Sequence, residues 1–196
     1  FNGDGLLANQ SNLNSPYSVT IDHEQNLVYI ADKGNCRVRQ VDRATNIMTT
    51  FLGNNCNPLD YRYVNPSNVV IDSLNNMVYI AQDLISISIL AVNRSSNAMH
   101  PIFPNYQVSI MHMEYDALTK TFYTVEHFSN SIMRISPTVQ SELLGQESVI
   151  AFNGDNIVAQ TANIHEPRGL AKNRKENVLY ISDTMNGRIR AVNMAS

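Results

Sequence analysis

The sequence predicts an all-β protein, a β-propeller of four-stranded antiparallel blades. Three observations predict it. The chain of 196 residues repeats itself at a fixed register, each repeat divides into four short β runs, and sustained helical periodicity is missing. Asparagine occurs 25 times against 8 glycines, and it tolerates the backbone conformations of tight turns. A fold of many short strands needs many such turn residues.

The repeat is clearest between the two ends of the chain. A shift of 151 positions aligns residues 1–45 with 152–196 without a gap, and 16 of the 45 pairs are identical. Phe1-Asn2-Gly3-Asp4 falls on Phe152-Asn153-Gly154-Asp155. Two weaker copies lie between them, because an apolar run with a central tyrosine recurs four times, at 28–32, 78–82, 122–126 and 179–183.

These runs divide the whole chain, 1–196, into blades. We assign 1–15 to the tail of a preceding outer strand plus a connector, and four blades to 16–56, 66–105, 106–152 and 167–196, the last one incomplete. The inner runs 19–21 and 69–71 are uniformly apolar, which predicts strands buried on both faces. Residues 141–144 are the exception to the β pattern, and we expect them to form a single helical turn.

The same residues resemble the NHL-repeat β-propeller family. Its pattern is a Pro-led inner strand ending in Asp, an apolar–Tyr–apolar–x–Asp strand, and then Asn-x-Arg-apolar-Arg. Residues 35–39 and 186–190 carry the last motif, whereas the second and third copies match only in their first two strands. The resemblance covers essentially the whole chain and implies a ring of about six blades.

That implication leaves three interpretations of the chain open. The four visible blades are part of a larger propeller, or they form a small closed ring in which the N-terminal segment completes the last blade. In the third interpretation, a neighbouring copy supplies outer strands by β-augmentation.

Composition excludes several classes of protein. Hydrophobic residues make up 43% and charged residues 16%, which argues against intrinsic disorder. The net charge of −3 argues against nucleic-acid binding through bulk charge. The longest apolar run, 84–92, is short and broken by serines, so we expect no membrane span.

Two cysteines and two glycosylation sequons bear on the compartment. Cys36 opens a third strand and Cys56 follows the fourth, so a hairpin near residues 44–45 brings them to the same edge and predicts a disulfide. Asn9 and Asn93 begin Asn-x-Ser sequons in connections. Together they favour an extracellular or cell-surface protein; a cytoplasmic module with two free thiols is the alternative.

The histidines suggest one enzymatic alternative. His127 and His165 lie in loops expected on the same face of a propeller, and His112 lies in an inner strand. By resemblance to the amidating-lyase members of the family, they would hold zinc or calcium on the propeller axis. Without a recognisable ligand spacing we expect no cofactor, and scattered surface histidines instead.

Repeated charged residues receive structural roles. Asp22, Asp72 and Asp116 each end an inner strand, where we expect a carboxylate to cap the following turn; lining a channel or binding calcium is the alternative. The same role is expected for the acidic or amide residues that end the second strands, Asp32, Gln82, Glu126 and Asp183. The alternating arginines of 37–39 and 188–190 are expected to be solvated at a strand edge, and an RNA-binding stripe is the alternative.

The third strand of the second blade is unusually apolar. If Ile85, Ile87 and Ile89 face outward, they form a contact patch for another chain. We therefore expect a non-enzymatic extracellular propeller that serves as an interaction or structural assembly module. Its partners would be a protein, further copies of itself, or a glycan. The alternatives are a metal-dependent, amidating-lyase- or lactonase-like propeller enzyme and a cytoplasmic NHL module that binds RNA or protein.

Overall fold

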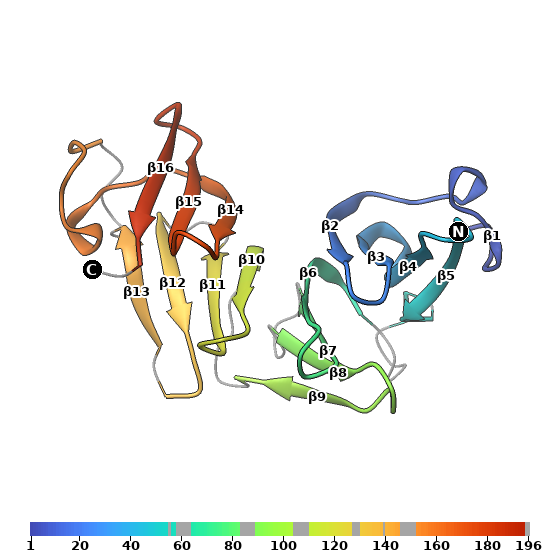
Figure 1. Cartoon of the computed structure of the whole chain (residues 1–196). Helices are drawn as coiled ribbons and strands as arrows, with labels where there is room; N and C mark the ends of the chain where they lie inside the picture. Colours follow the sequence, from blue (N-terminus) through green and yellow to red (C-terminus); the bar gives the residue numbers. More distant parts are fainter. Residues whose placement is uncertain are drawn as a thin grey trace. The chain divides into compact units, whose positions relative to one another are not determined.

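The computed structural model describes residues 1–54, 56–57, 64–82, 89–103, 110–126, 130–138, 140–145 and 152–194. Their regular structure is β-strand apart from three single 3-10 turns, and the fold is an all-β propeller fold built of antiparallel sheets (Figure 1). The chain divides into two compact units, Phe1–Ser109 and Ile110–Ser196, which are considered separately below.

Unit 1 holds two sheets, which we call blades 1 and 2. Blade 1 has the strand order β1-β5-β4-β3-β2 and blade 2 the order β6-β7-β8-β9. The strands of blade 1 are β1 (Leu6–Leu7), β2 (Pro16–Asp22), β3 (Leu27–Asp32), β4 (Arg37–Asp42) and β5 (Ile47–Leu52), with 3-10 turns η1 (Ala8–Gln10) and η2 (Lys33–Asn35). Those of blade 2 are β6 (Pro66–Asp72), β7 (Met77–Gln82), β8 (Ile89–Asn93) and β9 (Met99–Ile102).

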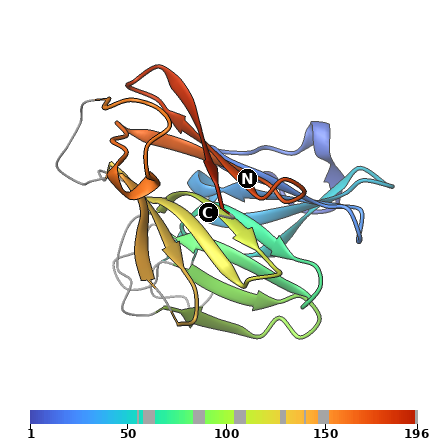
Figure 2. The ribbon, with the colours of Figure 1, turned by 60° about the vertical axis from the view of Figure 1, so that its left-hand side comes forward.

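Unit 2 holds blades 3 and 4, with the orders β10-β11-β12-β13 and β14-β15-β16. Blade 3 comprises β10 (Ile110–Asp116), β11 (Thr121–Glu126), β12 (Ser131–Ile135) and β13 (Gln140–Gly145). Blade 4 comprises β14 (Pro167–Asn173), β15 (Val178–Asp183) and β16 (Arg188–Asn193), preceded by the 3-10 turn η3 (Ala159–Thr161). In Figure 2, as in Figure 1, neighbouring strands follow one another through short hairpins, which is the meander of a propeller blade.

The first hairpin of every blade uses the same turn. A residue with positive φ stands just before the second strand in each blade, namely Asn26, Asn76, Lys120 and Asn177. The carboxylates of Asp22, Asp72 and Asp116 accept hydrogen bonds from backbone N–H groups of these turns, at 3.0–3.2 Å. The predicted capping role of these three residues is confirmed, and the abundance of asparagine is explained by the turns.

Each unit has its own apolar core between its two blades. In unit 1, buried side chains of blade 1 such as Tyr29 and Val38 pack against Val69, Val78 and Ile80 of blade 2. In unit 2, buried side chains of blades 3 and 4 form the second core: Tyr123, Val125, Ile132, Leu143, Leu144, Ala162, Ile164, Leu170, Leu179 and Ile181. Core packing therefore joins the blades in pairs, face to face.

Two sequence expectations about strands are wrong. Residues 141–144 belong to strand β13 rather than to a helical turn, because they pair with β12. The apolar inner strands also differ from each other. In β6, Val69 and Val70 are buried, whereas in β2 Val19 is 65% and Ile21 46% exposed.

Within the described residues, no helix is long and apolar enough to cross a membrane.

Candidate functional site: two connectors held by equivalent clasps

The segment that precedes blade 1 is fastened to the middle of that blade. The Phe1 ring lies 3.9 Å from the Arg37 guanidinium carbon and 4.9 Å from that of Arg39. Arg39 donates from Nη2 to the Gly3 carbonyl oxygen at 3.2 Å and to the Asp4 carboxylate at 2.9 Å. Although it lies on β4, the Arg39 side chain is fully buried. The sequence expectation of a solvated arginine is therefore wrong, because Phe1-Asn2-Gly3-Asp4 covers it.

Blade 4 repeats this arrangement. The Phe152 ring lies 4.0 Å from the guanidinium carbon of Arg188 and 5.0 Å from that of Arg190. Arg190 donates to the Gly154 carbonyl oxygen at 2.8 Å and pairs with Asp155 at 3.3 Å. The distances agree with those in blade 1 to within about half an ångström. We call each set, 1–4 with Arg37 and Arg39 or 152–155 with Arg188 and Arg190, a clasp.

An asparagine in each clasp closes the connector into a loop. The Asn2 amide donates to the Gln10 carbonyl oxygen at 2.8 Å, and its carbonyl oxygen accepts from the Asn12 backbone N–H at 2.7 Å. Asn153 makes the corresponding bonds to Thr161 at 2.6 Å and to Asn163 at 2.8 Å. In each connector the chain at the end of the 3-10 turn is thereby tied to an asparagine that precedes the turn, which fixes the connector conformation.

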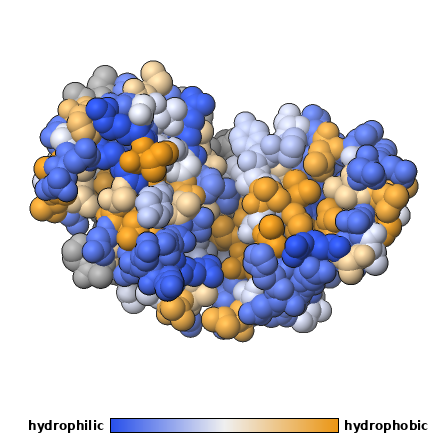
Figure 3. Space-filling model, turned by 45° about the horizontal axis from the view of Figure 1, so that its top comes forward, coloured by the Kyte–Doolittle hydropathy of each residue, from blue (hydrophilic) through white to orange (hydrophobic). Residues whose placement is uncertain are grey.

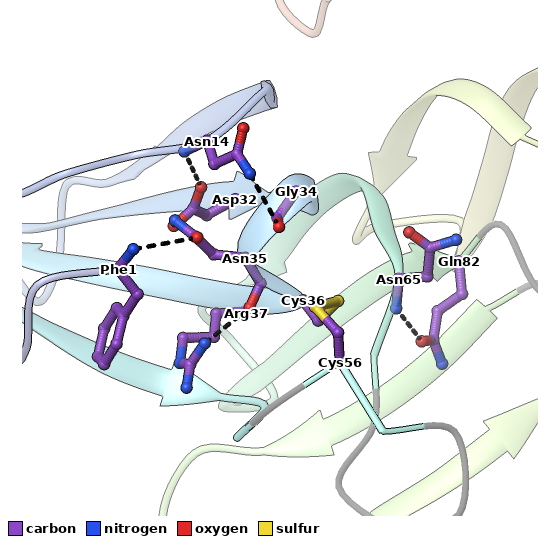
Figure 4. The surroundings of a disulfide bond; sticks show 10 residues. All are labelled: Phe1, Asn14, Asp32, Gly34, Asn35, Cys36, Arg37, Cys56, Asn65 and Gln82. Atoms are coloured by element: carbon purple, nitrogen blue, oxygen red, sulfur yellow. Dashed lines mark hydrogen bonds between the residues drawn. A yellow bond between two sulfur atoms is a disulfide. The ribbon is translucent and has the colours of Figure 1, made fainter.

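The acidic residue that ends the second strand holds the other end of the connector. In blade 1 the Asp32 carboxylate accepts from the Asn14 backbone N–H at 2.7 Å and from the Asn35 amide at 2.8 Å (Figure 4). Asp183 does the same in blade 4, with His165 at 2.8 Å and Asn186 at 2.9 Å. Gln82 accepts from the Asn65 N–H at 3.2 Å in blade 2. The structural role expected of these residues is thus present, but their backbone bonds go to the preceding connector, and Asp32 makes no side-chain cap bond to the turn η2 that follows it.

The two clasps differ in the bonds of their buried arginines: Asp4 pairs with Arg39 Nη2, whereas Asp155 pairs with Arg190 Nε, and Nη1 differs too. Arg190 Nη1 lies 3.4 Å from the Asn163 carbonyl oxygen and 3.5 Å from the Asp183 carboxylate. In blade 1 the Asn12 carbonyl oxygen accepts from the Asn35 amide at 3.4 Å, while the bond from that amide to Asp32 has a counterpart between Asn186 and Asp183. Arg39 Nη1 is buried without a hydrogen-bond partner among the residues that the structure describes.

A disulfide fastens the same edge of blade 1. Cys36 and Cys56 are bonded, with their Cα atoms 5.3 Å apart (Figure 4). Cys36 has a φ of +53° at the end of η2, directly before β4. Gly53 follows β5 with a φ of +93°, and a Cβ there would collide with the Cys36 carbonyl oxygen. The predicted disulfide is thus present, and glycine at position 53 allows the two chain segments to approach.

The histidines are not gathered by the described structure. His112 lies half-buried on β10, where burial lowers its pKa and a backbone hydrogen bond at Leu170 partly offsets that effect. His165 contributes its backbone N–H to Asp183, and His127 falls outside the described residues. Across the described ranges, no group of three or more His, Cys, Asp or Glu side chains is arranged to hold a metal ion.

The expected isoleucine patch is corrected at one position. Ile89 pairs with Ala81 on one side and Ile102 on the other, and it is fully buried. It therefore does not face outward. Ile85 and Ile87 lie outside the described residues.

The two sequons differ in their surroundings. Asn9 is exposed on η1, at the tip of the first connector. Asn93 is half-buried at the end of β8, and its side-chain oxygen accepts from the backbone N–H groups of Ser95 and Ser96, both at 3.0 Å. Glycosylation of both sites stays a prediction. Of the two asparagines, only Asn9 has an exposed side chain that caps no turn in the described structure.

Ionisable side chains gather where blade 3 meets blade 4. Asp116 forms an ion pair with Lys172, whose side chain is 3% exposed, and Arg174 donates to the Tyr115 carbonyl oxygen at 3.2 Å. Glu114 lies on the same face of β10. Burial raises its pKa to about 7, although Arg174 and Lys172 act in the opposite direction. We call Glu114, Asp116, Lys172 and Arg174 the charged seam.

Sequence reasoning missed the clasps. In the segment expected to end an outer strand, only Leu6–Leu7 is a strand, while Phe1-Asn2-Gly3-Asp4 binds Arg39. A signal was available, since the four residues and both arginines are identical in the two copies. The charged groups of the clasps bind the connectors, so the arrangement offers rigid polar connector surfaces rather than reactive side chains.

Comparison with known proteins supports the fold. Teneurin-1 of Gallus gallus is 25% identical over 232 aligned residues, which cover 97% of this chain and 8% of teneurin-1. No family model matches the chain. Among solved structures, an auxiliary nutrient binding protein from Bacteroides thetaiotaomicron has a TM-score of 0.71 at 16% identity, covering 94% of this chain and 46% of that one.

A nidogen/laminin complex has a TM-score of 0.69 at 14% identity, with 93% of this chain and 62% of that one covered. The chain thus spans a small part of teneurin-1 and less than two thirds of either solved chain. The β-propeller fold predicted from the sequence is confirmed.

Proposed function

We propose that this chain is a non-enzymatic, extracellular propeller of NHL type that binds protein or glycan partners through its clasped connectors. The observation that carries the proposal is the pair of clasps. Each one commits a buried arginine, an aspartate, an asparagine and an aromatic ring to holding a connector in one conformation. A preorganised loop loses little entropy when it binds, which favours recognition.

The connector surface suits polar recognition. Asn9, Gln10, Asn12 and Asn14 are exposed, and Tyr17 lies beside them, 59% exposed, with Lys33 Nζ 4.4 Å from its ring centre. Amides bind hydroxyl and peptide groups, and an exposed aromatic ring stacks on the apolar face of a sugar or side chain. Protein and glycan partners are therefore both accommodated by this chemistry.

The extracellular assignment is supported by the disulfide, which persists in oxidising compartments. Names of similar proteins point the same way: an auxiliary nutrient binding protein, a nidogen/laminin complex, and the extracellular domain of a putative one-component system, the last with a TM-score of 0.56 and 11% identity. The NHL assignment is supported by the Asn-x-Arg-apolar-Arg motifs, whose arginines build the clasps.

The test measures binding of the secreted chain to intact cells and to a glycan array. We expect saturable binding that falls at least about tenfold when Gln10 and Asn12 are both changed to alanine. The Leu118→Ala variant, altered in an exposed turn of unit 2, is the matched control and should bind like the unaltered chain. The proposal would be overturned if the chain bound saturably neither to cells nor to the glycan array, or if the Gln10 and Asn12 double variant bound as well as the unaltered chain.

A further inference from the structure

The turn before the third strand is built from different residues in blades 1 and 4. In both blades the residue directly before this strand has a left-handed backbone, with a φ of +53° at Cys36 and +62° at Gly187. The two residues are equivalent in the repeat, and each donates its backbone N–H to the carbonyl oxygen three residues earlier, at 2.9 and 3.1 Å. Glycine adopts this conformation freely, whereas the Cβ atom of other residues disfavours it. Blade 4 thus has a glycine where blade 1 has a disulfide-bonded cysteine.

The residues directly before Cys36 bind the end of the first connector, which we define as residues 5–15. The Gly34 N–H donates to the Asn14 carbonyl oxygen at 2.9 Å, and the Asn14 amide donates to the Gly34 carbonyl oxygen at 3.1 Å (Figure 4). The Asn35 amide donates to the Asn12 carbonyl oxygen at 3.4 Å. The first connector is therefore held by the turn η2, which Cys36 ends.

The residue that follows Cys36 belongs to the clasp. The guanidinium carbon of Arg37 lies 3.9 Å from the Phe1 ring, and Arg37 Nη1 donates to the Asn35 carbonyl oxygen at 2.7 Å. Cys36 joins Asn35, which binds the connector, to Arg37, which binds the aromatic ring. A change in the backbone conformation of Cys36 would therefore move these two residues relative to each other and disturb both sets of contacts.

The disulfide that restrains Cys36 can be reached by a reductant from one side. Cys36 is only 7% exposed, whereas Cys56 is an exposed residue. Over unit 1, at the right of Figure 3, hydrophilic residues border an area of hydrophobic ones, so a water-soluble reductant meets polar surface there. Exposed disulfides are the labile ones, because the attacking thiolate must reach a sulfur atom.

We propose that the Cys36–Cys56 disulfide is a reducible lock on the first connector. The cross-link keeps Cys36 in a left-handed conformation that its side chain disfavours, and so holds η2 and Arg37 in their bonded positions. A dithiol reductant releases Cys36 and loosens the first connector, whereas the second connector, which depends on Gly187, keeps its structure. This inference assigns a redox control to one of the two connectors, and its consequence for binding rests on the proposed function.

The reduction is a thiol–disulfide exchange in two steps. A thiolate of the dithiol bonds to the Cys56 sulfur as the Cys36–Cys56 bond breaks, and Cys36 leaves as a thiolate that takes up a proton. The second thiol of the reductant, as a thiolate, then displaces Cys56 from the mixed disulfide, and Cys56 is protonated in turn. Two electrons pass to the protein, which ends with two thiols, and the dithiol becomes a disulfide.

The cost of the left-handed conformation sets the size of the expected effect. For a residue other than glycine, leaving this conformation is favoured by a factor of about five to thirty. Once the cross-link is broken, the backbone N–H groups protected by the connector bonds should exchange faster by a factor in this range. These are the N–H groups of Asn12, Asn14 and Gly34.

The experiment follows hydrogen exchange of these three groups by NMR, with and without dithiothreitol. Alkylation and mass measurement verify that the folded protein has been reduced at both cysteines. After reduction we expect the three groups to exchange at least about fivefold faster. The equivalent groups of the second connector serve as the internal control and should exchange as before: Asn163, His165 and Met185.

Two double variants separate the left-handed residue from the loss of a cross-link. Cys36→Gly with Cys56→Ala gives blade 1 the residue type that blade 4 has, whereas Cys36→Ala with Cys56→Ala keeps a Cβ atom at position 36. Both lack the disulfide, and circular dichroism verifies that both fold. We expect the first connector of the Cys36→Ala double variant to exchange like that of the reduced protein. In the Cys36→Gly double variant it should exchange at least about fivefold more slowly than in the Cys36→Ala one.

The lock would be refuted by a disulfide that dithiothreitol leaves intact in the folded protein, or by unchanged exchange of the first connector after reduction. Equal acceleration in both connectors, or equal exchange in the two double variants, would refute it as well. Binding to cells and to the glycan array is measured on the same samples, and reduction should weaken it. If no sample binds while exchange changes as expected, the proposed function fails and the lock stands.

Discussion

Glu114 provides the sharpest quantitative prediction, through the substitution Glu114→Gln. The ordinary pKa of a glutamate is 4.5, and burial beside blade 4 raises that of Glu114 to about 7. The folded protein therefore disfavours the ionised carboxylate. Below pH 4.5 the group is protonated in both folded and unfolded chains and has no effect, whereas above pH 7 it is ionised in both and destabilises the fold fully.

The magnitude follows from the two pKa values. Since a tenfold change in proton affinity corresponds to 1.36 kcal/mol, the difference between 4.5 and about 7 limits the effect to about 3 kcal/mol. Glutamine is neutral and similar in shape, and Lys172 keeps its ion pair with Asp116. The variant should thus gain up to about 3 kcal/mol in free energy of unfolding, relative to the unaltered chain, as pH rises from 4 to 8.

The assay is urea unfolding of both proteins at several pH values between 4 and 8. Glu24→Gln is the matched control, because it removes a carboxylate at an exposed position of the β2–β3 turn. If Glu114→Gln is equally stable or less stable than the unaltered chain at pH 8, the described burial of Glu114 beside Lys172 and Arg174 is refuted.

Four further predictions concern other contacts. Changing Cys36 and Cys56 to alanine removes a disulfide that joins residues 20 positions apart in the sequence. The unfolded chain gains conformational freedom, so the free energy of unfolding should fall by about 3 kcal/mol. An unchanged midpoint of urea unfolding would contradict this. Arg39→Met should destabilise by about 2 kcal/mol by leaving Asp4 and the Gly3 carbonyl oxygen without their donor, and hydrogen exchange should show a loosened first connector. Burial raises the pKa of Asp116, but its bonds with Lys172 outweigh that effect and the net pKa is lowered. The Asp116 carboxylate therefore stabilises the fold above its ordinary pKa of 3.8, and this stabilisation fades as pH falls below that value. Asp116→Asn should reduce the free energy of unfolding at pH 7, and the difference from the unaltered chain should disappear towards pH 2. Asn9→Gln should remove one N-glycan, seen as a mass decrease in protein secreted from eukaryotic cells, and an equal mass would argue against use of that sequon.

Local patterns were sufficient to predict the blades and the disulfide. Alternation of apolar residues and the repeated turn residues specify each hairpin locally, so the strands β2 to β5 all fall within the first predicted blade, 16–56. The hairpin register then placed Cys36 near Cys56. In both cases the partners are close in sequence and related by the geometry of a single turn.

Contacts between distant segments could not be predicted in this way. An apolar run such as Val19–Ile21 indicates a strand but not whether a neighbour covers each face, and β2 proved exposed where β6 was buried. Nor does any local pattern show that Arg39 binds Asp4, 35 residues earlier. Ile89 was misjudged for the same reason, since its burial depends on pairing at both edges of β8.

The clasps also impose an order on how a blade forms. The residues from Phe1 to Asp4 are synthesised before every strand of blade 1, yet their arginine partner lies 35 to 36 residues later, on β4. Until β4 has paired with β3, the segment has no buried guanidinium to bind, and closing so long a loop is slow compared with forming one hairpin. The same delay separates Asp155 from Arg190. Each clasp is therefore expected to close after its hairpins, so that the connector becomes rigid only on a blade whose first three strands are already in place.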